Sequence, residues 1–205
     1  MANTSAFDAN AQDYDDWYAT HDDSYQLELQ ALRPLIPHGY GAEVGVGTGR
    51  FAQPFGIQLG IDPSLAMLRL AHRQGINVIQ AVAEQLPLAD ASVDFTLFVT
   101  TLCFVDDLQQ SLNEAARITK HNGHIIIGFI DRLSPMGQSY EKKKAGSRYY
   151  QQARFLSLAD IETALQREGF AINRCNQTLL DAPQQQTVLP GSGQGGFVAV
   201  QASRI

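Results

Sequence analysis

Short apolar runs alternate along the chain with polar stretches in which apolar residues recur every three or four positions. An apolar run of four to eight residues indicates a buried strand, and the longer repeat indicates one face of a helix. The first apolar run follows Tyr40 and meets an acid at Glu43. Six further strands are predicted at residues 56–62, 77–80, 93–100, 124–129, 170–180 and 197–200. Helices are predicted at residues 26–35, 65–74, 108–118 and 157–169.

The alternation of strands and helices predicts a parallel sheet whose crossovers are right-handed. The last two strands have no helix between them and should therefore be antiparallel. We expect an α/β fold with a doubly wound, mostly parallel seven-stranded sheet that ends in an antiparallel C-terminal hairpin. One domain, residues 1–205, accounts for a chain of this length.

Three segments fall outside this alternation. Residues 1–11 are expected to be a loose start, and a helical segment at about residues 9–36 either packs on the core or covers a pocket. Residues 132–155 form a polar insertion after the fifth strand, and residues 184–186 and 190–193 are expected in a surface loop.

Composition narrows the class of protein. With 44% hydrophobic and 18% charged residues the chain should be globular, and its net charge of −6 argues against a nucleic-acid partner. Two distant cysteines and five scattered histidines show no disulfide or metal-ligand spacing, so no metal is expected. The polar, acidic N-terminus and the absence of an apolar run near ~18 residues predict a cytoplasmic protein without a membrane segment.

A glycine-rich turn follows the first strand. Gly45, Gly47 and Gly49 alternate after Glu43, and such a turn before a helix N-terminus is typical of nucleotide binding. The dinucleotide fingerprint requires its third glycine one residue later, where this chain has Arg50. The plainer alternative is a glycine-rich turn without a ligand.

An acid ends the second predicted strand. At the end of the second strand of a doubly wound sheet, the Asp62 carboxylate can accept hydrogen bonds from both hydroxyls of a ribose. Alternatively, Asp62 could be a helix-capping residue. Ser64 is a candidate N-cap of the next helix.

Several short sequence motifs together resemble those of the class I S-adenosylmethionine (SAM) methyltransferases, in particular the type 11 group, which has a Rossmann-like fold. The resemblance covers about residues 14–202. The matching phrases are residues 43–49, 60–64 with Met67 and Leu68, 83–88, 93–95 and 112–118.

The resemblance implies SAM as cofactor and S-adenosylhomocysteine (SAH) as product. The cofactor-binding residues that it implies are Tyr14, Glu43, Val44, Gly45, Gly47, Arg50, Asp62, Pro63, Ser64, Ala83, Glu84, Gln85 and Thr100. Two positions depart from the family pattern. Val82 stands where an acid is frequent, and Phe104 stands where histidine is common, which removes an obvious general base.

The function that the resemblance implies is methyl transfer to a small molecule. The methyl group of SAM is already activated, so no catalytic residue can be assigned. Expected substrate-side residues are Trp17, Thr101, Cys103, Phe104, Tyr149 and Tyr150. Alternatives are a SAM- or SAH-binding protein without transferase activity, an RNA methyltransferase that uses the basic run 142–148, and a nicotinamide oxidoreductase, which Arg50 disfavours. The oligomeric state stays open.

Overall fold

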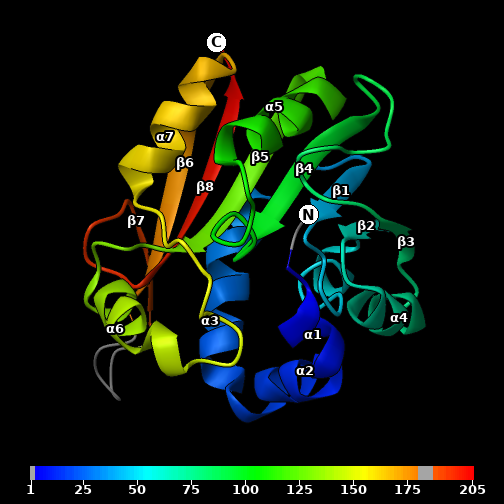
Figure 1. Ribbon diagram of the computed structural model, residues 1–205. Helices are drawn as coiled ribbons and strands as arrows, with labels where there is room; N and C mark the ends of the chain where they lie inside the picture. Colours follow the sequence, from blue (N-terminus) through cyan, green and yellow to red (C-terminus); the bar gives the residue numbers. More distant parts are fainter. Residues whose placement is uncertain (1–2, 180–186) are drawn as a thin grey trace.

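A single mixed sheet organises the chain in the computed structural model, which describes residues 3–179 and 187–205 (Figure 1). Its strand order is β3-β2-β1-β4-β5-β8-β6-β7. Strands β1 to β5 are parallel, and β8 runs antiparallel between β5 and β6. The strands are β1 (Gly41–Val44), β2 (Leu59–Asp62), β3 (Asn77–Gln80), β4 (Val93–Val99), β5 (Thr119–Ile130), β6 (Phe170–Leu179), β7 (Thr187–Pro190) and β8 (Phe197–Arg204). The predicted doubly wound α/β fold with antiparallel C-terminal strands is confirmed.

The sheet has eight strands, and the prediction of seven is wrong by one. The additional strand is β7, which pairs antiparallel with β6 at the sheet edge. Its Thr-Val-Leu sequence suits a strand, and Pro190 at its end is tolerated because β7 has a neighbour on one side only. The predicted loop therefore begins later, at Gly191, while residues 184–186 lie outside the described residues.

Seven α-helices and three short 3₁₀ helices accompany the sheet within the described residues. The α-helices are α1 (Ser5–Ala9), α2 (Ala11–Thr20), α3 (Asp22–Leu32), α4 (Leu65–Arg73), α5 (Leu108–Ile118), α6 (Pro135–Lys143) and α7 (Leu158–Arg167). The 3₁₀ helices are η1 (Arg33–Leu35), η2 (Gln53–Phe55) and η3 (Lys144–Gly146). The predicted capping residues are present: Ser64 caps α4, and Ser157 and Asp160 form a capping box on α7.

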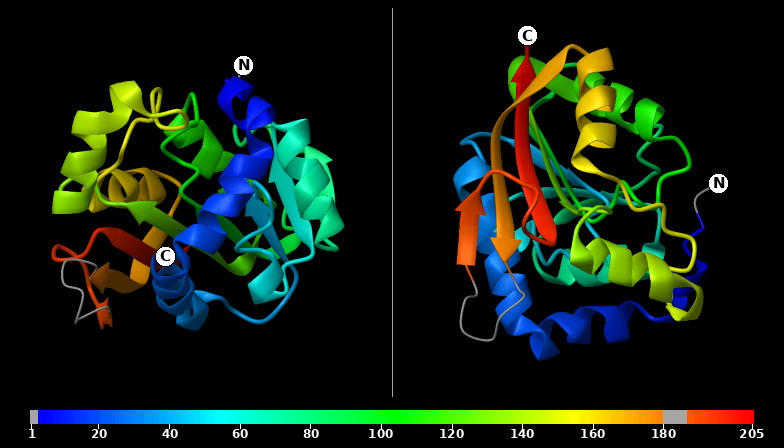
Figure 2. Two further views of the ribbon diagram at one scale, coloured as in Figure 1. Left: turned by 90° about the horizontal axis from the view of Figure 1, so that it is seen from below. Right: turned by 90° about the vertical axis from the view of Figure 1, so that its left-hand side faces the viewer.

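The helices cover both faces of the sheet, and side chains of β4 alternate between the two resulting cores. Phe98 packs with Leu112 of α5 and Ile161 of α7. Phe95 faces the other way and packs with residues of α3 and α4. Figure 2 shows α3 and α7 on opposite sides of the sheet. A strand between two helical layers must bury the side chains on both of its faces, as β4 does.

Two predicted local structures differ from those observed. The chain after the glycine turn forms no α-helix: turns lead into η2, where Pro54 lacks an N–H and Gly56 (φ 69°) ends the segment. Too few residues remain before β2 to nucleate and extend a helix. The polar insertion at residues 132–155 contains α6 and η3 and is therefore more ordered than predicted. Ser134 accepts from the Gly137 N–H as its N-cap.

The start of the chain is helical from Ser5, which corrects the prediction of a loose segment for residues 5–11, while residues 1 and 2 of that prediction lie outside the described residues. The reason is long-range packing of one aromatic ring. The ring of Phe7 lies 5.3 Å from that of Phe104 and 5.6 Å from that of Tyr149, measured between centroids. Such contacts order a short helix that would not be stable alone.

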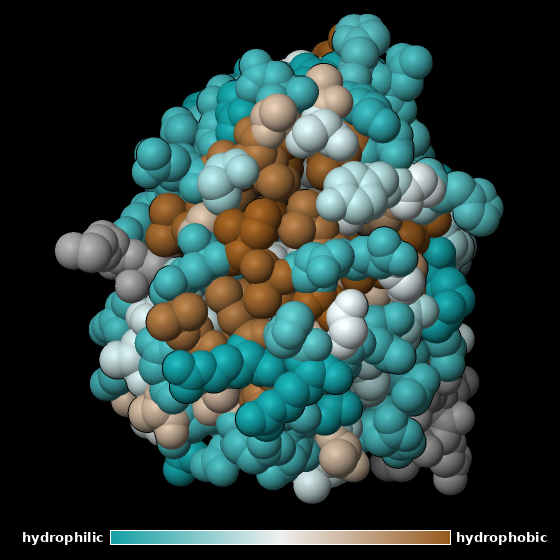
Figure 3. Space-filling model, turned by 90° about the vertical axis from the view of Figure 1, so that its right-hand side faces the viewer, coloured by the Kyte–Doolittle hydropathy of each residue, from teal (hydrophilic) through white to brown (hydrophobic). Residues whose placement is uncertain are grey.

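Strand β3 forms the other edge of the sheet and is only partly covered. Asn77 and Gln80 at its two ends are exposed, and Val78 and Ile79 between them are partly buried. Seen from the side of β3 and α4, the surface carries a central group of apolar side chains with hydrophilic ones around it (Figure 3).

Candidate active site

A hollow opens at the carboxyl ends of β1, β2 and β4, where ligands bind in open α/β sheets. Its cavity volume is about 100 Å³, and the space amounts to about 730 Å³ when the open mouth is included. The lining residues are Asn3, Thr4, Phe7, Tyr14, Gly45, Gly47, Asp62, Pro63, Ser64, Met67, Val82, Ala83, Val99, Thr100, Thr101, Phe104 and Val105.

The glycine turn gives this hollow a floor of bare backbone. Gly45 and Gly47 have φ values of 75° and 53°, which favour glycine. A Cβ on Gly45 would lie 2.2 Å from Cγ2 of Thr101, so no larger residue fits there. At Gly47 the nearest atom to such a Cβ is in the Tyr14 ring, 4.0 Å away. A ligand can therefore lie between Tyr14 and the backbone of the turn.

Asp62 ends β2 with its carboxylate facing the same hollow. The Gly47 N–H donates to Oδ2 at 2.9 Å, and the Ser64 N–H donates to Oδ1 at 2.8 Å. Burial, together with a smaller effect of the nearby Asp8 carboxylate, raises the pKa of Asp62 to about 6 despite the two backbone hydrogen bonds, which lower it. Each carboxylate oxygen keeps free lone pairs, so Asp62 can accept two hydroxyl hydrogen bonds from a ligand.

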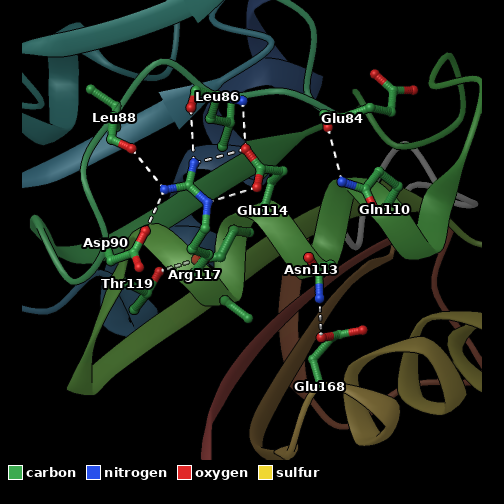
Figure 4. A network of polar contacts seen from close by, with 12 residues as sticks. Glu84, Leu86, Leu88, Asp90, Gln110, Asn113, Glu114, Arg117, Thr119 and Glu168 are labelled. Carbon is green, nitrogen blue, oxygen red and sulfur yellow. Dashed lines mark hydrogen bonds and ion pairs between the residues drawn. The ribbon is translucent and has the colours of Figure 1, made fainter.

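The loop at residues 82–88 forms one wall, and a network of polar contacts fixes it (Figure 4). Arg117 of α5 donates to the backbone oxygens of Leu86 and Leu88 and forms an ion pair with Glu114. Glu114 in turn accepts from the Leu86 N–H at 2.7 Å. Backbone N–H and carbonyl groups of the loop are thus both hydrogen-bonded to side chains of α5. Val82 and Ala83, at the start of the loop, line the hollow.

Thr100 lies between this hollow and a smaller one behind it. It follows β4 with φ 50°, a strained conformation for a residue other than glycine and one that is often found at functional sites. The second hollow is narrow, with a cavity volume of about 10 Å³, and is lined by Thr100, Leu102, Cys103, Phe129, Ile130, Tyr150, Phe155 and Leu156. A ligand in the first hollow would therefore approach a molecule in the second beside Thr100.

The N-terminal segment covers the mouth of the first hollow. Ser64 donates its hydroxyl to Oδ1 of Asp8 at 2.6 Å. Arg50, after the glycine turn, donates from Nε to Oδ1 of Asp15 at 2.7 Å and pairs with the same carboxylate through Nη2. The segment is thereby tied both to β2 and to the glycine turn.

Replacing Arg50 with alanine should loosen α2. Two charge-assisted hydrogen bonds to the partly buried Asp15 are lost, and about 1.4 kcal/mol of lost stabilisation makes local opening tenfold more frequent. Chymotrypsin cleaves after aromatic residues such as Tyr14 and Trp17, so its cleavage rate in α2 should rise about tenfold. The control is Arg148→Ala, whose exposed pair with Asp13 should contribute little. Equal cleavage rates in both variants would contradict this role for Arg50.

The structure brings ten predicted site residues to the first hollow. They are Tyr14, Gly45, Gly47, Asp62, Pro63, Ser64, Ala83 and Thr100 from the cofactor set, and Thr101 and Phe104 from the substrate set. Cys103 and Tyr150 line the second hollow, and Tyr149 lines a surface hollow next to Phe104.

The other predicted residues lie elsewhere. Glu43 and Arg50 line a small hollow that adjoins the first one and shares Tyr14, Gly45, Gly47 and Val99 with it, and Val44 is buried within β1. Glu84 uses Oε1 to accept from the Asp106 and Asp107 N–H groups. The side chain of Gln85 is exposed. Trp17 lies outside, where its ring stacks on His21 at 4.3 Å.

Three chemically reactive side chains near the site, those of Cys103, Asp107 and Asp131, have structural surroundings. Burial raises the pKa of the Cys103 thiol to about 12, so it is not a ready nucleophile. Asp107 caps α5, and Asp131 accepts from the Leu133 N–H. Within residues 3–179 and 187–205, no three metal-ligating side chains cluster, and no helix is long and apolar enough to cross a membrane.

Sequence reasoning missed Asn3, Thr4, Phe7, Met67, Val82, Val99 and Val105 in the first hollow. The one usable signal was Phe7, a lone apolar ring among polar residues.

The site fits the nucleoside of SAM on three observations. Asp62 offers a buried carboxylate for the ribose hydroxyls, the glycine turn offers bare backbone, and Val82 and Ala83 offer an apolar surface to the adenine. Oε2 of Glu43 is buried without a partner in the described structure, and an orphaned acid beside the turn suits the cofactor's amino group. Fold and site together define a class I SAM-dependent methyltransferase.

Comparison with known proteins agrees. Residues 42–127 match the family described as a methyltransferase domain. The chain is 40% identical to a SAM-dependent methyltransferase of known structure from Thermotoga maritima, with a TM-score of 0.94 over 98% of this chain and 100% of that one. It is also 42% identical to an uncharacterized protein of Methanocaldococcus jannaschii, over 98% of this chain and all of that protein.

A third relative is an uncharacterized protein of Mycobacterium tuberculosis, 36% identical over 98% of this chain and 75% of its own length. This chain belongs to the SAM-dependent methyltransferases of the type 11 group, and its cofactor is SAM.

SAM affinity should depend on pH through Asp62. The ribose hydroxyls require its carboxylate form, and the pKa of Asp62 is raised to about 6. Below that pH the carboxyl must first lose a proton, so Kd should rise about tenfold for each further pH unit. Titration calorimetry between about pH 5 and pH 7.5 measures this change. Asp62→Asn should show weaker binding without that slope, and a wild-type Kd constant over the range would exclude the role.

Proposed function

We propose that this chain transfers the methyl group of SAM to a small-molecule acceptor that binds in the second hollow, beside Thr100. The observation that carries the proposal is the arrangement of two adjoining hollows, of which the first fits SAM and the second is a narrow, mostly apolar space beside Thr100. Its cavity volume is about 10 Å³, so a polymer is excluded from the interior, and a small acceptor enters only if lining side chains such as Tyr150 and Phe155 move apart.

The chain's own residues would act mainly by positioning. When bound, SAM supplies a methyl group already activated on a sulfonium sulfur. Asp62 and the glycine turn orient the cofactor, while Phe104, Tyr149 and Tyr150 exclude water from the space beside Thr100. Holding the two reactants close together and excluding water from between them can supply much of the rate enhancement in such a transfer.

One relative's description supports a small acceptor. The Thermotoga maritima protein is described as a possible histamine N-methyltransferase, so a small amine is the first acceptor to test here. The RNA alternative has weaker support because the basic run is partly neutralised: Lys144 pairs with Glu141, and Arg148 pairs with Asp13.

The test follows a labelled methyl group from SAM. The purified protein is incubated with a protein-free small-molecule extract of cells and, separately, with total cellular RNA. Label should appear in low-molecular-mass products together with SAH. Label in RNA instead would support the RNA alternative. SAM binding without any transfer would favour a binding protein and overturn the proposal.

A further inference from the structure

Helix α1 crosses the mouth of the first hollow and is attached at two places. On the side of β2, Oδ1 of Asp8 accepts from the Ser64 hydroxyl at 2.6 Å. On the side of β4, the ring of Phe7 lies edge-on to that of Phe104 at 5.3 Å and stacks on that of Tyr149 at 5.6 Å. Because Phe7, Ser64 and Phe104 also line the hollow, α1 is part of its wall.

Little within α1 itself keeps the helix in place. It has five residues, none of them buried, and its N-cap position, Thr4, makes no side-chain capping bond. A helix of this length is not stable alone in water, so its order depends on Ser64 and on the aromatic rings that it contacts. Surface segments that are held by a few contacts open locally at a low cost in free energy.

The interior of the first hollow is too small for the whole cofactor while α1 stays in this position. Its cavity volume is about 100 Å³, whereas pockets that enclose ligands of this size measure about 300–1,000 Å³. The rest of the space belongs to the mouth, where Phe7 lies with Asn3 and Thr4, the residues just before α1. The other walls belong to the sheet and to the loop that Arg117 holds, so α1 is the wall that moves most easily.

We infer that α1 is a flap over the cofactor site, and that its opening sets the rate at which SAM enters and SAH leaves. The hydrogen bond between Asp8 and Ser64 is the latch of this flap, and Phe7 is its second attachment. The latch joins two protein groups, so it resists opening equally with and without the cofactor. Because cofactor exchange does not depend on the acceptor, this role of α1 goes beyond the proposed function and applies whatever the acceptor is.

The latch brings two acids to one serine. The Ser64 hydroxyl donates to Asp8, and the Ser64 N–H donates to Oδ1 of Asp62 at 2.8 Å. The hydroxyl holds the pKa of Asp8 below its usual value, so Asp8 is charged at neutral pH. Two carboxylates this close repel each other, which offsets part of the hydrogen bond. The latch is therefore weak enough to release during a catalytic cycle, as active-site flaps must.

Rate constants for SAH binding and release test this role. Rapid filtration with radiolabelled SAH gives the association rate constant after mixing and the release rate constant after dilution into unlabelled SAH. Asp8→Ala should raise both rate constants about fivefold, which is the effect of one hydrogen bond on local opening. Its Kd, the ratio of the two, should stay within about twofold of the wild type because a flap changes both rates alike.

A second variant and a matched control accompany this measurement. Phe7→Leu weakens the other attachment and should also raise both rate constants, which tests the flap independently of Asp8. The control Asp16→Ala removes an exposed acid of α2 whose carboxylate accepts from Gln12, and it should match the wild type in both rate constants. Thermal unfolding of each variant shows that the sheet is intact.

The possible failures can be told apart. If the wild type binds no SAH, the cofactor assignment fails and the flap fails with it. If SAH binds and Asp8→Ala changes only the release rate constant, Asp8 contacts the cofactor directly and the role of a latch is overturned. Rate constants for Asp8→Ala that equal those of Asp16→Ala would also overturn it, while SAM binding and the proposed methyl transfer would stand.

Discussion

Asp62→Ala should weaken SAM and SAH binding by about 100-fold or more. Two hydroxyl hydrogen bonds to a carboxylate contribute about 1.5–3 kcal/mol each, and about 2.7 kcal/mol corresponds to 100-fold. The variant also removes the acceptor for the Gly47 N–H, which holds the glycine turn against β2. Titration calorimetry with both ligands measures the loss.

Two further variants separate binding from folding. Asp62→Asn keeps the shape of the side chain but not its charge, so it should retain more affinity than Asp62→Ala. Asp23→Ala removes an exposed acid from α3 and should leave the Kd unchanged. Binding by Asp62→Ala within threefold of the wild type, with the fold intact, would show that the ribose lies elsewhere.

Arg117→Ala should lower the free energy of unfolding by about 2–4 kcal/mol. Arg117 bonds the carbonyls of Leu86 and Leu88 and pairs with Glu114, whose side chain is 11% exposed. Its removal leaves these acceptors unsatisfied and frees the loop that carries Ala83. Urea unfolding measures the change, and SAM affinity should fall as well because the loop forms a wall of the hollow.

The control for Arg117 is its second ion-pair partner, Asp90. Asp90 is 79% exposed, so Asp90→Ala should change stability by less than about 0.5 kcal/mol. Arg117 also holds the pKa of Glu114 below its usual 4.5, so this stabilisation is complete above that pH and is lost as the pH falls through the folded-state pKa. Equal stabilities for Arg117→Ala and Asp90→Ala would contradict the role of the network.

The sheet could be predicted because its strands carry strong local signals. The run at residues 93–100 is mostly apolar, as expected for a strand with helices on both faces, and it is observed as β4, Val93–Val99. The acid at Asp62 could be placed at a strand end for the same reason. Ser64 and Ser157 were readable as caps because capping depends on neighbours within a few residues.

Other features depend on partners distant in the sequence and could not be predicted from it. Helix α1 is ordered by the packing of Phe7 on Phe104 and Tyr149. Glu84 looked like a cofactor residue, but its carboxylate is used by the Asp106 and Asp107 N–H groups. Neither contact can be inferred from the composition of the neighbouring sequence.

The glycine turn is the opposite case: its local signal was correct for the turn and misleading for the helix expected after it, because Pro54 and Gly56 leave too little chain.

Binding of SAM and SAH to the wild-type protein, freed of carried-over ligand, is the most direct test of the central claim that the hollow beside Asp62 holds this cofactor. Calorimetry should give one site per chain with Kd in the micromolar range, about −8 kcal/mol, and no heat with NADH. No binding of either SAM or SAH would contradict the account, and binding of NADH instead would assign the glycine turn to nicotinamide chemistry.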